Sequence, residues 1–200
     1  ALSGKRGGAW MSGFRSRMQT EHGLQKPICY MVGNFTPPVG GQPALLTHDE
    51  VNTLFHEFGH GLHHMLTEVD NISVAGTHGV AWDAVELPSQ FTEFWTWDKD
   101  SRDLVSEHIE TKESLPEHLL KALLAARFFQ SGMQTLRQIE FSLFDLSIHK
   151  LTPALNADGI QSTLDDIRQK YAVLATAPYN RFQNGFRHIF AGGYAEEYYS

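Results

Sequence analysis

Four histidines and one glutamate are concentrated in the stretch LFHEFGHGLHHML, residues 54–66. On an α-helix, His56 and His60 lie about 40° and one turn apart, close enough to bind the same metal ion. Glu57 follows the first of these histidines, as in the pattern H-E-x-x-H, where this carboxylate accepts a proton from the water on the metal. The spacing therefore predicts a metal site formed by His56 and His60, with Glu57 as the general base.

The two remaining histidines of this stretch fit the site less well. His60 and His64 have the same spacing, but the residue after His60 is Gly61, which offers no base. His63 lies on the same helix face as His56 but about 10 Å further along the axis, too far to share its ion. We expect His63 to lie near the ligands without binding the metal.

A catalytic zinc ion normally has a third protein ligand and leaves its fourth position to water. Glu86, in the segment WDAVELPSQFTEF, comes 26 positions after His60 and lies in an apolar run that we expect to be helical. Asp83 and Glu93, within one and two helical turns of Glu86, are candidates to orient a ligating imidazole. For all three carboxylates, exposure on a helix surface is the alternative interpretation.

Local sequence signals predict a mainly α fold with a small β-sheet. Thr47 and Glu50 have the spacing of a capping box, at the start of the helix that carries the histidines. Apolar residues then recur every three or four positions, which indicates one buried helix face. The segment PICYMVGNF, bounded by proline and glycine, is typical of a strand. The expected strands are 9–14 and 27–35, and the expected helices are 47–69, 84–97, 116–150 and 160–174.

The overall composition favours a single domain over residues 1–200 and excludes several partners. The chain is 42% hydrophobic, enough for one substantial core. Its formal net charge of −7, without a Lys/Arg cluster, argues against a nucleic-acid partner, and no apolar run is long enough to span a membrane. Cys29 is the single cysteine, so no intrachain disulfide can form, and a cytoplasmic location fits best.

Four segments together resemble the zinc oligopeptidases of the thimet oligopeptidase and oligopeptidase A family. They are FHEFGHGLHHML, GTHGVAWDAVELPSQFTEFW, YMVGNFTPPVGGQPALLTHDEV and HIFAGGYAEEYY, and the resemblance covers essentially the whole chain. It implies a zincin-like catalytic core of the gluzincin type, one Zn²⁺ ion per chain and short peptides as substrates. The activity that it implies is endopeptidase hydrolysis by a metal-activated water.

The resemblance also implies roles for individual residues. His56 and His60 match the two zinc histidines of the family, and Glu86 matches its third ligand. Tyr194 matches a tyrosine whose hydroxyl helps to stabilise the tetrahedral intermediate. His188 lies near a family histidine that helps to bind the substrate.

Members of this family are several times longer than these 200 residues. The chain starts with Ala1 and ends at YYS, where the family usually has another tyrosine, so we expect a fragment that lacks part of the catalytic machinery. Helices that pack on the missing regions expose apolar surface, and residues 119–129, LLKALLAARFF, are expected to mediate self-association. His78 is a candidate substrate contact if its loop, GTHG, faces the cleft.

Three other functions remain open at this point. A dipeptidyl carboxypeptidase needs subsites for the C-terminus of its substrate, which the sequence does not identify. A non-catalytic module that binds zinc or peptide has no need for Glu57, which is present. A structural zinc site usually has four protein ligands, often cysteines, and this chain has a single cysteine.

Overall fold

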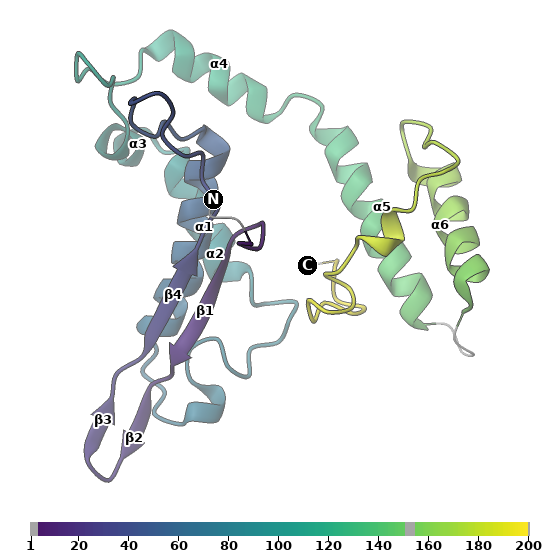
Figure 1. Cartoon of the computed structure of the whole chain (residues 1–200), viewed down its shortest axis with the longest axis horizontal. Coiled ribbons are helices and arrows are strands. Elements are labelled where there is room, and N and C mark those ends of the chain that lie inside the picture. The colour runs from purple at the N-terminus through teal and green to yellow at the C-terminus, as the bar shows by residue number, and fades with distance from the viewer. Residues whose placement is uncertain (1–3, 151–154, 200) are drawn as a thin grey trace. The chain divides into compact units, whose positions relative to one another are not determined.

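The computed structural model describes residues 4–150 and 155–199, and Figure 1 shows their course. The chain divides into two compact units, Ala1–Glu117 and His118–Ser200. Helices predominate, which confirms the mainly α prediction, and the expected small sheet consists of two separate two-stranded sheets. A single domain over residues 1–200 stays a prediction.

Two antiparallel strand pairs form the sheets of the first unit. They are β1 (Trp10–Arg15) with β4 (Ile28–Val32), and β2 (Met18–Thr20) with β3 (Gly23–Gln25). In the β1–β4 pair Trp10 lies opposite Val32, and a register shift between Gly13 and Arg15 marks an irregularity of β1. Both strands expected from the sequence are present, and β4 is shorter than expected at each end, where Pro27 and a run of turn residues limit it.

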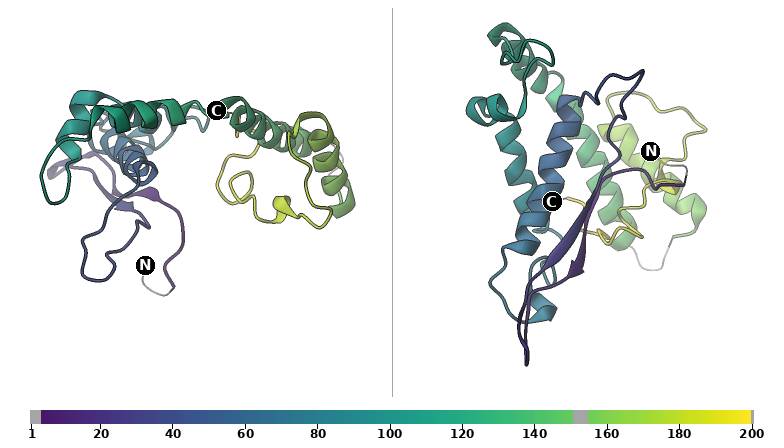
Figure 2. Two further views of the ribbon diagram at one scale, coloured as in Figure 1. Left: turned by 90° about the horizontal axis from the view of Figure 1, so that it is seen from above. Right: turned by 60° about the vertical axis from the view of Figure 1, so that its left-hand side comes forward.

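Helix α1 (His48–Met65) is packed on two sides within the first unit. Its Gly59 faces helix α2 (Leu87–Glu93), whereas Gly61 faces Cys29 and Met31 of β4. Figure 2 shows α1 running beside the β1–β4 pair. The other helical elements of this unit are short: η1 (Ile72–Val74), η2 (Phe94–Thr96) and α3 (Lys99–Val105).

The second unit has its own core. This unit contains α5 (Ser131–Lys150), α6 (Ala157–Tyr171) and η3 (Phe182–Asn184), and α4 (Glu117–Arg127) precedes them. Asn156 caps α6, where its side-chain oxygen accepts a hydrogen bond from Gly159 N at 2.8 Å. The fully or almost fully buried core residues come from α5, α6 and the C-terminal segment: Phe144, Leu164, Ile167, Phe186 and Ile189.

The helical structure expected over 116–150 is present as two helices, α4 and α5, with a break at residues 128–130 that the sequence did not indicate. Gln130 has a positive φ of 54°, which is not a helical conformation. Phe128 and Phe129 beside it are 68% and 69% exposed, and no residue of α4 is buried. The expected exposure of apolar side chains in residues 119–129 is thus confirmed, while self-association through them stays a prediction. Among the described residues, no helix is long and apolar enough to cross a membrane.

Candidate metal centre

The start of α1 is fixed by the capping box that the sequence predicts. Thr47 Oγ1 accepts a hydrogen bond from Glu50 N at 3.2 Å, and Glu50 Oε2 accepts one from Thr47 N at 2.8 Å. The other oxygen, Glu50 Oε1, accepts from Thr36 N at 2.6 Å and from Thr36 Oγ1 at 2.7 Å. These bonds, first that from the Thr47 backbone and then those from Thr36, lower the pKa of Glu50 to about 2. The carboxylate therefore holds both the helix start and the segment that leads to it.

Three side chains of types that commonly bind metal ions converge where α1 meets the start of α2. Glu86 Oε2 lies 3.1 Å from His56 Nε2 and 3.0 Å from His60 Nε2. All three donor atoms lie within 4.8 Å of one another. Two imidazole nitrogens and one carboxylate oxygen form the donor set that a catalytic zinc ion takes from a protein. The residues present therefore fit such an ion.

Glu86 reaches the histidines from a position that differs from the expected one. The sequence predicts it inside a helix over 84–97, but α2 begins at Leu87 and Glu86 is its N-cap residue, after turns that precede it. Pro88 in the first turn of α2 is compatible with this start, since the first backbone N–H groups of a helix have no helical partner. Glu86 is therefore placed by a helix start and not by a helix face.

The two helices approach closely at Gly59, one residue before His60. A Cβ atom on Gly59 would lie 2.4 Å from Thr92 Oγ1, 2.6 Å from Pro88 O and 2.6 Å from Ser89 Cα. Thr92 Oγ1 in turn lies 2.7 Å from the carbonyl oxygen of Phe55, to which it can donate across the helix pair. Only glycine permits this distance between α1 and α2, and the distance brings Glu86 to the histidines.

A second carboxylate fixes the orientation of the first histidine. Glu93 Oε1 lies 2.6 Å from His56 Nδ1, and because a carboxylate only accepts, the proton belongs to Nδ1. Burial lowers the pKa of His56, but hydrogen bonds to Glu86 and Glu93 outweigh it and raise this pKa to about 9. The sequence had suggested Glu93 as an orienting carboxylate, and its side chain makes that contact.

Glu57 is almost completely buried, at 7% exposure, on the same helix. Among the described residues its Oε2 atom has no hydrogen-bond partner. Burial raises the pKa of this carboxyl, against the lowering effect of His56 and His60 and of a hydrogen bond from the Met11 backbone. A buried carboxylate with a raised pKa beside converging imidazoles is typical of a proton acceptor in a functional site.

Comparison with known sequences places the chain in a family. The sequence profile of peptidase family M3 matches residues 1–200. This chain belongs to peptidase family M3. It is 51% identical to oligopeptidase A of Salmonella typhimurium over 197 residues, which are 98% of this chain and 29% of that protein. Oligopeptidase A of Escherichia coli is 51% identical over 201 residues, 100% of this chain and 30% of that protein.

A more distant relative carries a different activity in its name. Dipeptidyl carboxypeptidase of Salmonella typhimurium is 33% identical over 201 residues, 100% of this chain and 29% of that protein. This M3 chain thus spans about three tenths of the length of these relatives.

Three other candidates from the sequence lie outside the donor cluster of this M3 chain. His63 has a buried Nδ1 atom without a partner among the described residues, and burial lowers its pKa. His78 Nδ1 lies 3.1 Å from Ile72 O and 3.4 Å from Ser16 Oγ, so its contacts are with the segment before it and with the residue after β1. Asp83 is exposed in the turns before Glu86.

His188 and Tyr194 belong to the second unit of the M3 chain and are neighbours there. Tyr194 N donates to His188 O at 3.0 Å, and their ring centroids are 6.4 Å apart. Asp145 of α5 anchors the turns that follow, because its carboxylate accepts from Glu196 N at 2.9 Å and from Tyr198 N at 3.1 Å. His188 is exposed and Tyr194 is half-buried.

Sequence reasoning missed two residues that hold the carboxylates of the cluster. Ser89 Oγ lies 2.8 Å from Glu86 Oε2, and Asn52 Nδ2 donates to Glu93 Oε2 at 2.9 Å. The spacing of these two residues from Glu86 and His56 could have identified them. Ser89 follows Glu86 by three positions, the spacing of side-chain contacts at helix starts, and Asn52 precedes His56 by four, one helical turn.

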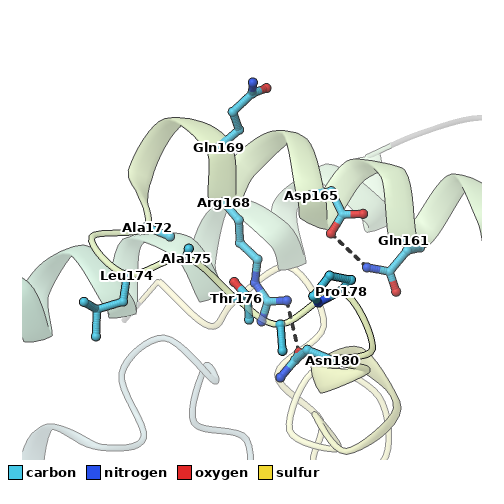
Figure 3. Close-up of a pocket in the computed structure, with 11 residues that line it drawn as sticks. Gln161, Asp165, Arg168, Gln169, Ala172, Leu174, Ala175, Thr176, Pro178 and Asn180 are labelled. Carbon is cyan, nitrogen blue, oxygen red and sulfur yellow. Dashed lines mark hydrogen bonds between the residues drawn. The ribbon is translucent and has the colours of Figure 1, made fainter.

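The cavity drawn in Figure 3 belongs to a different part of the M3 chain. It has a volume of about 520 Å³ and lies beside α6 and the segment that follows it. Arg168 enters it and donates from Nη1 to Asn180 Oδ1 at 3.1 Å. None of the residues that line it is a candidate from the sequence, so we assign it no part in the metal centre.

Proposed function

We propose that this chain is the zinc-binding catalytic core of an oligopeptidase that hydrolyses short peptides. One observation carries the proposal: the ligand atoms of His56, His60 and Glu86 converge within 4.8 Å of one another, on the helix that also carries the buried Glu57. A histidine pair on one helix and a glutamate after it is the ligand arrangement of a zincin-like, gluzincin-type core. The similarity to oligopeptidase A over nearly the whole chain supports the same assignment.

The residues of the chain divide the chemistry among them. A zinc ion bound there would act as a Lewis acid and would lower the pKa of the water molecule bound to it. Glu57 receives the proton of the attacking water and passes it to the leaving amine, a role that suits a carboxyl whose pKa burial raises. Glu93 keeps the His56 proton on Nδ1, which leaves Nε2 free to act as a ligand.

Tyr194 and His188 complete the proposal. We assign the Tyr194 hydroxyl to hydrogen bonding with the oxyanion of the tetrahedral intermediate, and His188 to substrate binding. Their position in HIFAGGYAEEYY and their mutual contact support these roles. Glycine supports the shape of this segment, since Gly193 has a positive φ of 90° and a Cβ on Gly192 would lie 2.7 Å from His188 Cα.

The substrate class and the setting are parts of the same proposal. Short peptides are the substrates, and the formal charge of −7 gives no support to a nucleic-acid partner. We place the protein in the cytoplasm, in keeping with its single cysteine. Exposed Phe128 and Phe129 are the surface through which we expect self-association of this chain.

The second candidate activity is that of a dipeptidyl carboxypeptidase. Sequence identity favours the endopeptidase, since it is 51% to oligopeptidase A and 33% to dipeptidyl carboxypeptidase. Digestion of one peptide with a free C-terminus and of the same peptide with an amidated C-terminus separates the two. An endopeptidase cleaves both, whereas a dipeptidyl carboxypeptidase cleaves only the free form.

Metal content tests the core of the proposal. We expect one zinc ion per chain by mass spectrometry of protein purified without chelator, and cleavage of a short peptide by the same sample. His60→Ala should remove the zinc, whereas His22→Ala should not, because His22 is an exposed histidine far from the cluster in sequence. A chain that carries zinc and binds peptide without cleaving it is the non-catalytic module instead.

A further inference from the structure

The imidazole of His56 stands at the end of a chain of three hydrogen-bonded side chains. Glu93 Oε1 contacts His56 Nδ1 at 2.6 Å, and Glu93 Oε2 accepts from Asn52 Nδ2 at 2.9 Å. The amide oxygen of Asn52 accepts in turn from Thr96 Oγ1 at 2.9 Å. Thr96 is only 2% exposed, so the far end of this chain is inside the protein.

This arrangement leaves Asn52 no freedom to turn its amide. Its oxygen faces a hydroxyl donor, Thr96, and its nitrogen faces a carboxylate, Glu93, which only accepts. A flipped amide would place two acceptors against each other at Glu93. Asn52 therefore holds the oxygen of Glu93 that the imidazole does not use, and so fixes the plane of the carboxylate.

A separate contact holds the ligand Glu86. Ser89, which is fully buried, places its hydroxyl 2.8 Å from Glu86 Oε2, the oxygen that faces both histidines. The same hydroxyl lies 2.8 Å from the backbone oxygen of Glu86. Glu86 is the N-cap residue of α2, and Ser89 in the first turn of this helix supplies a restraint on its side chain.

We propose that Ser89 and Asn52 are positioning residues of the metal centre, which set its affinity for zinc without touching the ion. Ser89 orients the ligating oxygen of Glu86, and Asn52 orients His56 through Glu93. The inference rests on the proposed function and extends it to residues outside the ligand set. Partners of this kind typically change metal affinity by about 10- to 100-fold when they are removed.

The test compares two substitutions with two matched controls. Ser89→Ala removes the hydroxyl, and Asn52→Leu keeps the size of the side chain but removes the amide. Thr92→Val removes a hydroxyl of α2 that contacts the Phe55 carbonyl of α1, and Thr53→Ala removes a hydroxyl next to Asn52 whose one partner among the described residues is the carbonyl of Asp49. The zinc dissociation constant is measured against a chromogenic chelator, and the visible absorption spectrum of the Co²⁺-loaded protein is recorded as a report on ligand geometry.

We expect Ser89→Ala and Asn52→Leu each to weaken zinc binding by about 10- to 100-fold and to change the Co²⁺ spectrum. Both controls should keep the dissociation constant and the spectrum, even where Thr92→Val lowers the unfolding midpoint of the metal-free protein. Unchanged affinity in both test variants would overturn this inference alone, and so would an equal loss in Thr92→Val. Absence of zinc binding by the unsubstituted chain would overturn the proposed function together with it.

Discussion

Both units bury carboxylates, but they surround them differently. In the second unit, Glu140 is 2% exposed and accepts from Arg137 Nη1 at 2.6 Å and from Arg168 Nε at 2.8 Å. Asp145 is fully buried and accepts two backbone N–H groups, and His149 Nδ1 lies 2.7 Å from it. Each of these acids is surrounded by donors.

Two carboxylates of the first unit, Glu86 and Glu57, lie beside the imidazoles of His56 and His60. Glu86 shares one oxygen between two histidine nitrogens, and Glu57 has an oxygen without a partner among the described residues. Buried polar groups that are fully paired specify and stabilise a fold, whereas converging or unpaired ones are candidates for function. By this criterion the carboxylates of the first unit, and not Glu140 or Asp145, are the candidates for function.

The largest effect that this contrast predicts concerns Glu57. Glu57→Gln should lower the rate of peptide hydrolysis by about 10²- to 10⁴-fold, because the amide cannot accept the proton of water. Zinc content should stay at the level of the unsubstituted chain, and the free energy of unfolding should not fall, since the substitution removes a buried charge. Peptide cleavage and metal content are measured on the same samples, with Glu21→Gln on the exposed surface as the control. Hydrolysis at the original rate would exclude Glu57 as the base.

The counterpart in the second unit is Glu140→Ala, which should change stability and not metal binding. Two guanidinium groups lose their common carboxylate, and such a loss typically costs about 3–5 kcal/mol in the free energy of unfolding. All four tryptophans lie between residues 10 and 97, so their fluorescence reports the first unit, while circular dichroism reports helices of both.

Urea titrations followed by both signals give the measurement for Glu140→Ala. We expect the transition seen by circular dichroism to move to lower urea more than the one seen by fluorescence, with unchanged zinc content. Glu110→Ala, at an exposed position of the first unit, is the control. A loss of zinc from Glu140→Ala would contradict the separation of the two clusters.

A smaller effect follows from the pKa of His56. Burial lowers this pKa, but Glu86 and Glu93 outweigh burial and raise it from 6.5 to about 9 in the metal-free chain. A raised pKa means that its contribution to stability is complete below about pH 6.5 and is lost as the pH rises through 9, by at most about 3 kcal/mol. Unfolding of metal-free protein by urea, followed by tryptophan fluorescence at pH 6.5 and pH 9.5, measures this loss. Glu93→Gln should flatten the dependence, and an equal slope in both proteins would refute the assignment.

The smallest predicted effect is a difference in the free energy of unfolding between alanine substitutions at two glycines of α1. Gly59→Ala forces a methyl group against the backbone of α2 and should cost about 1–3 kcal/mol in the free energy of unfolding. Gly61→Ala places its methyl group 3.6 Å from Cys29 Sγ, an ordinary contact, and should stabilise by about 0.4–1 kcal/mol. Fluorescence-detected urea unfolding measures both variants. A similar effect of the two would show that the close approach at Gly59 does not restrict α1 and α2.

The sequence was a good guide wherever the signal is local. The capping box of Thr47 and Glu50 and the apolar period after it predicted α1, because both depend on neighbours within the helix. The spacing of His56 and His60 predicted their convergence for the same reason. The approach of Glu86 to these two histidines was also expected, but the position of Glu86 at the start of α2 was not.

Non-local contacts were beyond the sequence. Nothing in the periodicity shows that Thr96 and Asn52, 44 positions apart, share a hydrogen bond, because the bond exists only once α1 and η2 are packed. The break at residues 128–130 was missed for a related reason. Phe128 and Phe129 continue an apolar helical pattern, and the positive φ of Gln130 has no signature in a residue type that usually favours helices.

The carboxylate of Glu50 has a practical consequence for engineering. It joins Thr36 to Thr47, so residues 37–46 form a closed loop whose base is held by one side chain, and every residue of this loop is exposed. Lengthening a closed flexible loop is inexpensive, since each doubling of its length costs only about 0.6 kcal/mol. An affinity tag or a fluorescent reporter inserted at Gly40–Gly41 should therefore leave α1 intact and place the label near the start of the helix that carries His56 and His60.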